Sequence, residues 1–174
     1  MIFKTDWTEY LHSIKREEVK KVFDFLGQKK FDSGIEFGAG DGYQTVLLAP
    51  HFNDFTSSDL NFSRIKDSQK LSTVHYVKCD ADNIDEVFND KQFDLVFSSS
   101  MLEHLGDPRG FLKNTNRILK DAGYGVHIVP NRYLKIAYIL FFYVNVCILI
   151  LDRIMGLFQG KKIFRGAEIH LENN

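Results

Sequence analysis

The feature that most limits the fold of this chain is a glycine cluster between an apolar strand and a helix. Residues 35–42 read I-E-F-G-A-G-D-G, and the next segment, residues 43–49, predicts a helix that Pro50 ends. A strand, a glycine turn and a helix in this order are typical of a parallel α/β unit. Such units bind their ligand at the carboxyl end of the strand, so we expect a ligand site at this turn.

Strands and helices alternate along the rest of the chain. Apolar residues at three- and four-residue steps predict a helix over residues 7–26, and two more helices are predicted over about 62–70 and over 108–123. Strands are predicted over residues 34–37, 54–59, 74–78, 93–97 and 125–129. This alternation calls for parallel pairing, so we expect a Rossmann-like, three-layer α/β sandwich with a mainly parallel sheet of about five strands.

Composition narrows the classes of protein that the chain can belong to. It has 174 residues, 44% of them hydrophobic, and a net charge of −1, so it predicts a globular chain with no charge surplus for nucleic acid. Cys79 and Cys147 lie far apart, and no histidine cluster has ligand spacing, so we expect neither a disulfide nor a metal site. The first residues carry no signal-peptide pattern, which favours a cytoplasmic location.

The glycine spacing disfavours a dinucleotide site. A dinucleotide fingerprint that starts at Gly38 or at Gly40 needs a small residue where this chain has Tyr43 or Thr45. Glu36, two residues before the first glycine, would also repel a pyrophosphate. A nucleotide-dependent oxidoreductase is therefore the weaker interpretation, and a cationic ligand without phosphate is favoured.

Two more carboxylates follow the next two predicted strands. Asp59 lies 21 residues beyond Gly38, where an acidic residue can accept both hydroxyls of a ribose. Asp80 follows the third strand and can accept from an exocyclic amine such as that of adenine. We therefore expect a nucleoside ligand, while the alternative that each carboxylate only caps a turn stays open.

These residues resemble the class I S-adenosylmethionine-dependent methyltransferases of the type 11 branch, which includes the ubiquinone and menaquinone C-methyltransferases. The resemblance covers about residues 34–129, through E-F-G-A-G-D-G, S-D-L, C-D-A-D and F-D-L-V-F-S-S-S-M-L-E-H-L. It implies S-adenosylmethionine as the cofactor and methyl transfer as the activity. The implied cofactor-binding residues are Glu36, Gly38, Gly40 and Gly42 for the methionine end, Asp59 and Leu60 for the ribose, Asp80 and Ala81 for the adenine, and Ser98 beneath the sulfonium.

The resemblance also implies elements that this sequence does not match. Domains of this family usually have seven strands, and the last two form an antiparallel hairpin. Residues 133–174 would have to hold that hairpin, but an apolar run occupies much of this segment, so we expect the hairpin to be missing or replaced. The expected parts are a helical cap over residues 1–30, the cofactor-binding core over 31–130 and an apolar helical segment over 131–174. A fragment of a longer protein and a non-catalytic relic of the fold both stay open.

Two residues after the fourth strand are candidates for catalysis. Methyl transfer needs alignment of donor and acceptor, and a base only where the acceptor must lose a proton. Glu103 and His104 lie at the correct end of the sheet, and His104 is the better base because an ordinary histidine titrates near neutral pH. The alternative is that both residues only hold their loop in place.

The apolar run covers residues 136–151 and contains no charge. As a helix, its 16 residues span about 24 Å, which is shorter than the roughly 30 Å hydrocarbon core of a membrane. Lys161, Lys162 and Arg165 follow, and a basic cluster beside an apolar helix favours peripheral contact with the inner face of a membrane. One alternative is a buried helix that covers the fifth strand or pairs with a second subunit or a missing C-terminal part. A full span is the other, and it would need a thinned membrane or snorkelling side chains. Because the run follows the fifth strand, we expect a small, hydrophobic or lipid-like acceptor.

Overall fold

The computed structural model describes residues 7–27, 30–65 and 70–158. The chain divides into two compact units, residues 1–129 and residues 130–174. The basic residues Lys161, Lys162 and Arg165 lie outside the described residues, so their predicted contact with a membrane stays a prediction.

The first unit contains a sheet of five parallel strands. They are β1 (Phe31–Phe37), β2 (Phe52–Asp59), β3 (Val74–Lys78), β4 (Phe93–Ser99) and β5 (Leu119–Ile128), in the spatial order β3-β2-β1-β4-β5. The order reverses between β1 and β4, because β2 and β3 continue the sheet on one side and β5 on the other. In an open α/β sheet, the crevice at such a reversal is where ligands bind.

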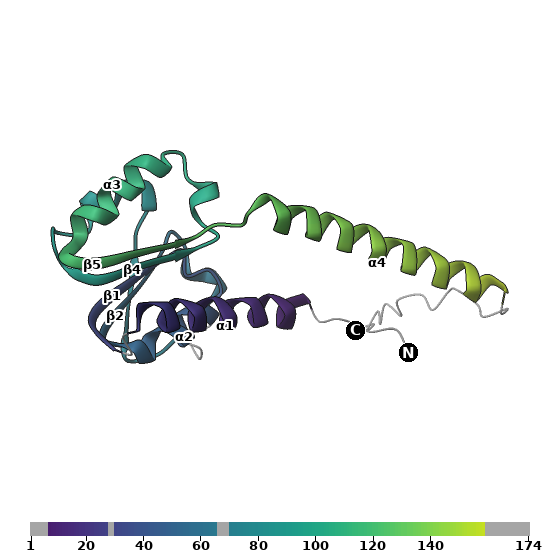
Figure 1. Ribbon diagram of the computed structural model, residues 1–174, viewed down its shortest axis with the longest axis horizontal. Coiled ribbons are helices and arrows are strands. Elements are labelled where there is room, and N and C mark those ends of the chain that lie inside the picture. Colours follow the sequence, from purple (N-terminus) through teal and green to yellow (C-terminus); the bar gives the residue numbers. More distant parts are fainter. Residues whose placement is uncertain (1–6, 28–29, 66–69, 159–174) are drawn as a thin grey trace, which may run out of the picture. The chain divides into compact units, whose positions relative to one another are not determined.

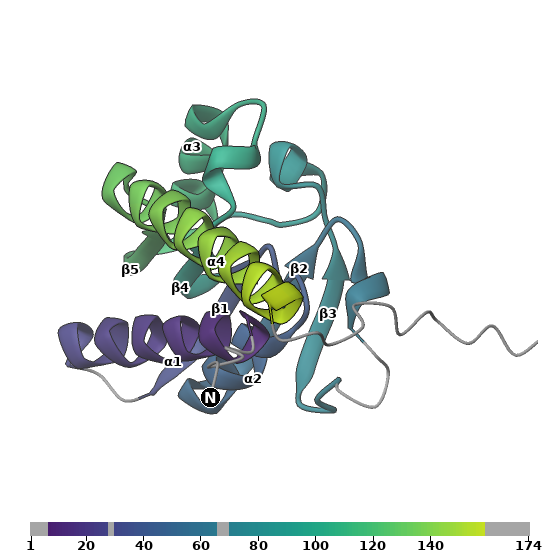
Figure 2. The same ribbon diagram turned by 90° about the vertical axis from the view of Figure 1, so that its right-hand side faces the viewer.

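Helices cover both faces of this sheet, as Figures 1 and 2 show. On one face, α1 (Trp7–Leu26) and α2 (Tyr43–Leu48) bury Val19, Phe23 and Leu48 against Phe97 and other strand residues. On the other face, α3 (Pro108–Ile118) packs Phe111 and Ile118 on side chains that alternate with the first set along the strands. The predicted Rossmann-like three-layer sandwich is therefore confirmed.

Within the described residues, four short 3-10 helices lie in the loops, and one of them corrects a prediction. They are η1 (Ala49–His51), η2 (Phe62–Arg64), η4 (Ala81–Glu86) and η5 (Leu102–His104). The helix expected over about 62–70 is wrong at its start, where only η2 forms, because Ile65 takes an extended backbone with φ −97° and ψ 116°. Residues 66–69 of that prediction lie outside the described residues.

A second correction concerns the segment between α3 and β5. The helix expected over residues 108–123 ends at Ile118, and β5 already begins at Leu119. Leu119 pairs with Phe93 of β4, and Lys120 binds the Asp94 carboxylate at 3.0 Å. These contacts with a distant strand outweigh the local helical pattern from which the prediction was made.

The second unit contains α4 (Arg132–Phe158), a helix of 27 residues that extends beyond the predicted run at both ends. Its side chains between positions 136 and 151 include many large apolar groups with exposed fractions of 40% to 67%. They are Ile136, Ile139, Leu140, Phe141, Phe142, Tyr143, Val144, Ile148, Leu149, Ile150 and Leu151. In the part of the chain that the structure describes, no helix is sufficiently long and apolar to cross a membrane.

Candidate functional site

The glycine loop after β1 is held against the end of β2. The backbone N–H groups of Gly38 and Ala39 both donate to the Ser58 carbonyl oxygen, at 2.9 and 3.2 Å. Gly38 has φ 81° and Gly42 has φ 78°, in the left-handed region that favours glycine. A Cβ at Gly38 would also lie 3.1 Å from the Met101 side chain. The backbone conformation and this close side chain therefore both favour glycine at position 38.

Asp59, at the end of β2, is bonded to this loop. Its Oδ2 accepts from the Gly40 N–H at 2.8 Å, and its Oδ1 accepts from the Asn61 N–H at 2.9 Å. A carboxylate oxygen has two lone pairs, so each oxygen keeps the capacity to accept from a ligand. The structure thus brings together the residue predicted to bind ribose and the loop predicted to bind the methionine end.

Glu36 is buried beneath the loop, with 1% of its surface exposed. Its Oε2 accepts from the Thr45 hydroxyl at 2.5 Å, and that hydroxyl lies 3.1 Å from the Ser57 hydroxyl. Burial raises the pKa of Glu36 to about 7, while the Thr45 hydrogen bond and the positive charge of Lys15 lower it. A cationic ligand would favour the ionised form of this carboxyl group.

Besides Asp59, three residues predicted at the nucleoside end lie after β2 and β3. Leu60 follows Asp59 and is 60% exposed, while Ala81 packs partly buried beside the core. Asp80 is exposed and caps η4, because its Oδ1 accepts from the Asp82 N–H at 3.0 Å. This cap is the role in a turn that the sequence analysis gave as the alternative for Asp80. It still leaves lone pairs of the Asp80 carboxylate available to a ligand.

Ser98, at the end of β4, is fully buried and pairs with His127 of β5. The Ser98 Oγ lies 2.9 Å from the His127 Nδ1. The His127 ring also packs edge-on against Phe111 of α3, and burial lowers its pKa below the ordinary value. The sequence alone could not reveal this pairing with Ser98, because the two residues lie 29 positions apart.

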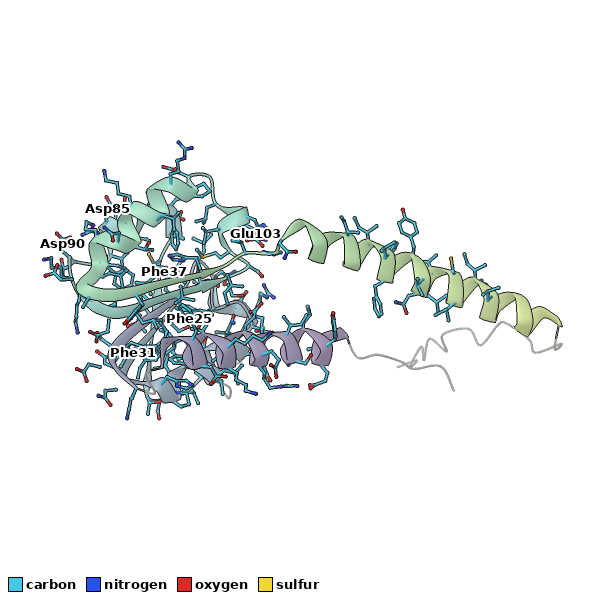
Figure 3. All side chains as sticks on the ribbon, viewed as in Figure 1. Phe25, Phe31, Phe37, Asp85, Asp90 and Glu103 are labelled. Carbon is cyan, nitrogen blue, oxygen red and sulfur yellow. The ribbon has the colours of Figure 1, made fainter. Side chains whose placement is uncertain are left out.

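The two candidate catalytic residues lie on η5, beyond the end of β4. Glu103 and His104 are both exposed. Figure 3 labels Glu103 at the carboxyl ends of the strands, and Asp90 at the opposite end of the unit. Their position fits the predicted role, which stays a prediction.

The contacts of α1 with the site are what the sequence analysis missed. The His12 Nε2 lies 3.3 Å from the Asp41 Oδ2, and the His12 ring stacks on Tyr43 at a centroid distance of 3.6 Å. Arg16 donates to the Tyr43 hydroxyl at 2.6 Å. Partial burial would raise the pKa of Asp41, but hydrogen bonds from the Tyr43 N–H and from His12 lower it. The sequence feature that could have indicated these contacts is the presence of polar residues on one face of α1.

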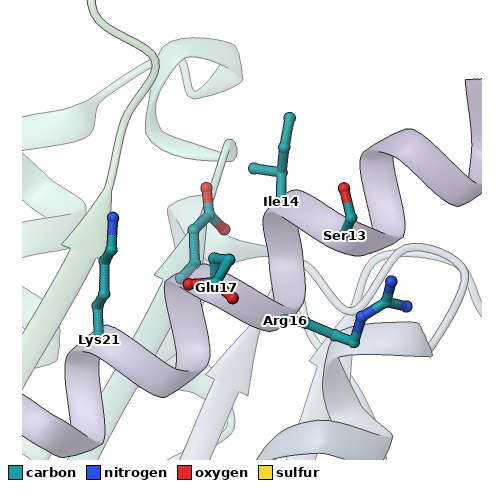
Figure 4. A pocket seen from close by; sticks show the side chains of 6 residues that line it. Ser13, Ile14, Arg16, Glu17 and Lys21 are labelled. Atoms are coloured by element: carbon teal, nitrogen blue, oxygen red, sulfur yellow. The ribbon is translucent and has the colours of Figure 1, made fainter.

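Two open hollows lie along α1. Figure 4 shows the first, a hollow of about 440 Å³ lined only by α1 side chains, among them Ser13, Ile14 and Lys21. The second is a groove of about 500 Å³ between α1 and β5, lined mainly by apolar residues such as Val22 and Val126. Among residues 7–27, 30–65 and 70–158, no cluster of acidic, histidine or cysteine side chains is arranged to hold a metal ion.

Comparisons with known proteins agree on one family. Residues 35–126 match the family model described as a methyltransferase domain. The malonyl-[acyl-carrier protein] O-methyltransferase of Haemophilus ducreyi is 28% identical over 135 residues, which cover 70% of this chain and 51% of that protein. The ubiquinone biosynthesis O-methyltransferase of Rickettsia bellii is 25% identical over 126 residues, which cover 71% of this chain and 51% of that protein. The chain thus spans about half the length of these curated relatives.

Solved structures show the same fold. The N-methyltransferase NodS of Bradyrhizobium japonicum, in complex with S-adenosyl-L-homocysteine, superposes with a TM-score of 0.56 at 24% identity, covering 64% of this chain and 60% of NodS. A SAM-dependent methyltransferase of Aquifex aeolicus superposes with a TM-score of 0.53 at 19% identity, covering 62% of each chain.

Proposed function

Because the chain belongs to the methyltransferase domain family, we propose that it binds S-adenosylmethionine and transfers its methyl group to a small-molecule acceptor. The observation that carries the proposal is the arrangement at the carboxyl ends of the central strands. There Asp59 accepts a hydrogen bond from the glycine loop and Glu36 accepts one from Thr45 of α2, beside the reversal of strand order where ligands bind. The matches lend no support to an oxidoreductase.

The chemistry of the loop residues fits this cofactor. A Cβ placed at Gly40 would meet no atom closer than 4.0 Å, so the loop is open on that side to a ligand. The buried Glu36 carboxylate suits a positively charged group, since its raised pKa reflects the cost of burying a negative charge. A phosphate would find the opposite environment here.

The cofactor, when bound, would supply an activated methyl group: an acceptor nucleophile bonds to the methyl carbon, the carbon–sulfur bond breaks, and S-adenosylhomocysteine leaves as a neutral thioether. We assign Glu36, Gly38, Gly40 and Gly42 to its methionine end and Asp59 and Leu60 to its ribose. Asp80 and Ala81 are assigned to its adenine, and Ser98 to the floor below the sulfonium. His104, with Glu103 beside it, would accept the proton of an acceptor that must lose one.

We further propose that the acceptor is hydrophobic or associated with a membrane. The relatives named above are O-methyltransferases of a malonyl-acyl carrier protein and of ubiquinone biosynthesis. Support in this chain comes from α4, whose side chains from Ile136 to Leu151 include many exposed apolar groups. A contact between α4 and the inner face of a membrane would cover these side chains, and a homodimer contact is the alternative.

Isothermal titration calorimetry tests the cofactor proposal. Purified full chain is titrated with S-adenosylhomocysteine and, separately, with NAD. We expect saturable binding of S-adenosylhomocysteine and none of NAD. Binding of NAD alone would overturn the proposal. Binding of S-adenosylhomocysteine by a chain that methylates no acceptor would favour the non-catalytic relic of the fold.

Liposome flotation tests the membrane proposal. We expect the chain to float with anionic vesicles, and the double substitution Phe141→Ser and Phe142→Ser to weaken flotation while binding of S-adenosylhomocysteine is retained. Phe25→Ser is the matched control, because Phe25 is an 89% exposed aromatic residue of the other unit. A folded chain that never floats would contradict the proposal, and a dimer in gel filtration would favour the alternative.

A further inference from the structure

Lys15 lies on the face of α1 that borders the glycine loop. His12 reaches Asp41 at 3.3 Å, and Glu18 accepts a hydrogen bond from Ser99 at 3.0 Å. Lys15 is three residues from each of these two helix residues, and residues three apart share a face of an α-helix. The side chain of Lys15 is therefore placed between the loop after β1 and the end of β4, and it is half-buried there.

The surroundings of Lys15 are acidic. Burial is the largest influence on the pKa values of both Glu36 and Asp41, and the positive charge of Lys15 lowers each of them. An ammonium that acts on both carboxyl groups lies near the end of β1 and near the loop that follows. Among the residues that the structure describes, Lys15 makes no hydrogen bond or ion pair within 4 Å, so its charge is available to a ligand.

The amino-acid end of S-adenosylmethionine carries an ammonium and a carboxylate. The carboxyl groups of Glu36, Asp41 and Asp59 around the loop attract the ammonium but repel the carboxylate, so the second group needs a cation. The other two basic side chains on this part of α1 are already occupied. His12 pairs with Asp41, and Arg16 binds Glu9 at 2.7 Å.

We propose that Lys15 binds the carboxylate at the amino-acid end of S-adenosylmethionine, so that α1 completes the cofactor site opposite the glycine loop. This inference rests on the proposed function. It assigns α1 a role in binding the cofactor in addition to its role in covering the sheet. It also predicts that the chain distinguishes ligands by their carboxylate.

A comparison of two ligands and two proteins tests this pairing. The ligands are S-adenosylhomocysteine and its decarboxylated analogue, which keeps the ammonium and lacks only the carboxylate. The proteins are the full wild-type chain and Lys15→Met, and affinities come from calorimetry. We expect the substitution to weaken S-adenosylhomocysteine about 10- to 100-fold, the loss of one charge-assisted hydrogen bond, and to leave the analogue unchanged. The coupling between the two deletions isolates the contact.

Two further variants control for charge and folding. Lys20→Met removes the same charge from an exposed position on another face of α1 and should bind both ligands like the wild type. Lys15→Arg keeps the cation and should retain most of the affinity for S-adenosylhomocysteine. Equal losses for both ligands in Lys15→Met, or no loss for either, would overturn the inference while the proposed function stands. A wild-type chain that binds neither ligand would overturn the proposed function itself.

Discussion

The Asp59 carboxylate accepts a hydrogen bond from the Gly40 backbone N–H at 2.8 Å, and this bond joins the end of β2 to the glycine loop after β1. A carboxylate at this position orients the loop and also remains partly exposed at the edge of the crevice. We therefore expect Asp59 to act on the proposed cofactor in two ways, through direct contact and through the loop.

Asp59→Ala should weaken binding of S-adenosylhomocysteine by roughly 1.5 to 3 kcal/mol, because charge-assisted hydrogen bonds are lost. Asp59→Asn keeps an oxygen that can accept from the Gly40 N–H, so its loss should be smaller. Calorimetry measures both affinities, and thermal unfolding should show little change in stability. Normal binding by the alanine variant would mean that Asp59 only forms the turn.

Gly42→Ala should destabilise the chain more than Gly27→Ala. Both glycines have a positive φ, of 78° and 62°, so alanine at either position is strained by about 1 to 2 kcal/mol. Only at Gly42 would the added Cβ also crowd the Ile65 side chain, at 3.0 Å, whereas nothing lies within 4 Å at Gly27. Urea unfolding of the two variants measures the difference, and equal losses would contradict the role of the Ile65 contact.

Glu36→Gln should remove a dependence of stability on pH. The pKa of Glu36 is raised from 4.5 to about 7, so the folded chain binds this proton more tightly than the unfolded chain does. The free energy of unfolding should therefore fall as the pH rises from about 4.5 to 7, by an amount on the order of 3 kcal/mol, and stay level above that range. Urea unfolding without ligand between pH 5 and 8 measures the effect.

The comparison of wild type with Glu36→Gln also separates this effect from that of His127. Burial lowers the pKa of His127, so its contribution to stability is lost as the pH falls and has the opposite sign. Both proteins contain His127, so their difference isolates Glu36. Parallel pH profiles of the two proteins would contradict the prediction.

Asp94→Asn should destabilise the sheet by about 1 to 2 kcal/mol, because the carboxylate accepts several hydrogen bonds in a partly buried position. It accepts from the Ser33 N–H at 2.8 Å, from the Ser33 hydroxyl at 2.9 Å and from Lys120 at 3.0 Å. Asp121→Asn is the matched control, because Asp121 forms a solvent-exposed ion pair with Lys91. Exposed ion pairs contribute little to the free energy of unfolding. Similar losses in denaturant unfolding of both variants would be against the prediction.

Several parts of the fold and of the candidate site were predictable from local pattern. The apolar alternation of residues 74–78 predicted β3 with its observed bounds, and the periodicity of residues 7–26 did the same for α1. The glycines at 38, 40 and 42 predicted a turn after the first strand, and in the structure all three have positive φ. Such features depend on residues close together in the chain, so the sequence shows them directly.

Other parts depended on partners that are distant in the chain. The start of β5 at Leu119 follows from its pairing with Phe93, which the helical pattern of residues 108–123 does not show. The contacts of Ser98 with His127 and of His12 with Asp41 each join residues 29 positions apart. No local pattern predicts which of several polar side chains will meet across such a separation.

The order of strands and helices, the glycine turn and the carboxylates at successive strand ends could be predicted before the structure was known, because periodicity and turn chemistry are local. Packing between elements determines which face of α1 lies on the glycine loop, and with it the positions of His12 and Lys15. It also determines that Glu36 is buried with a raised pKa while Asp80 stays exposed. Burial and nearby charges change a pKa, and both depend on which elements pack together. Neither can be inferred from the identity of one residue and its sequence neighbours.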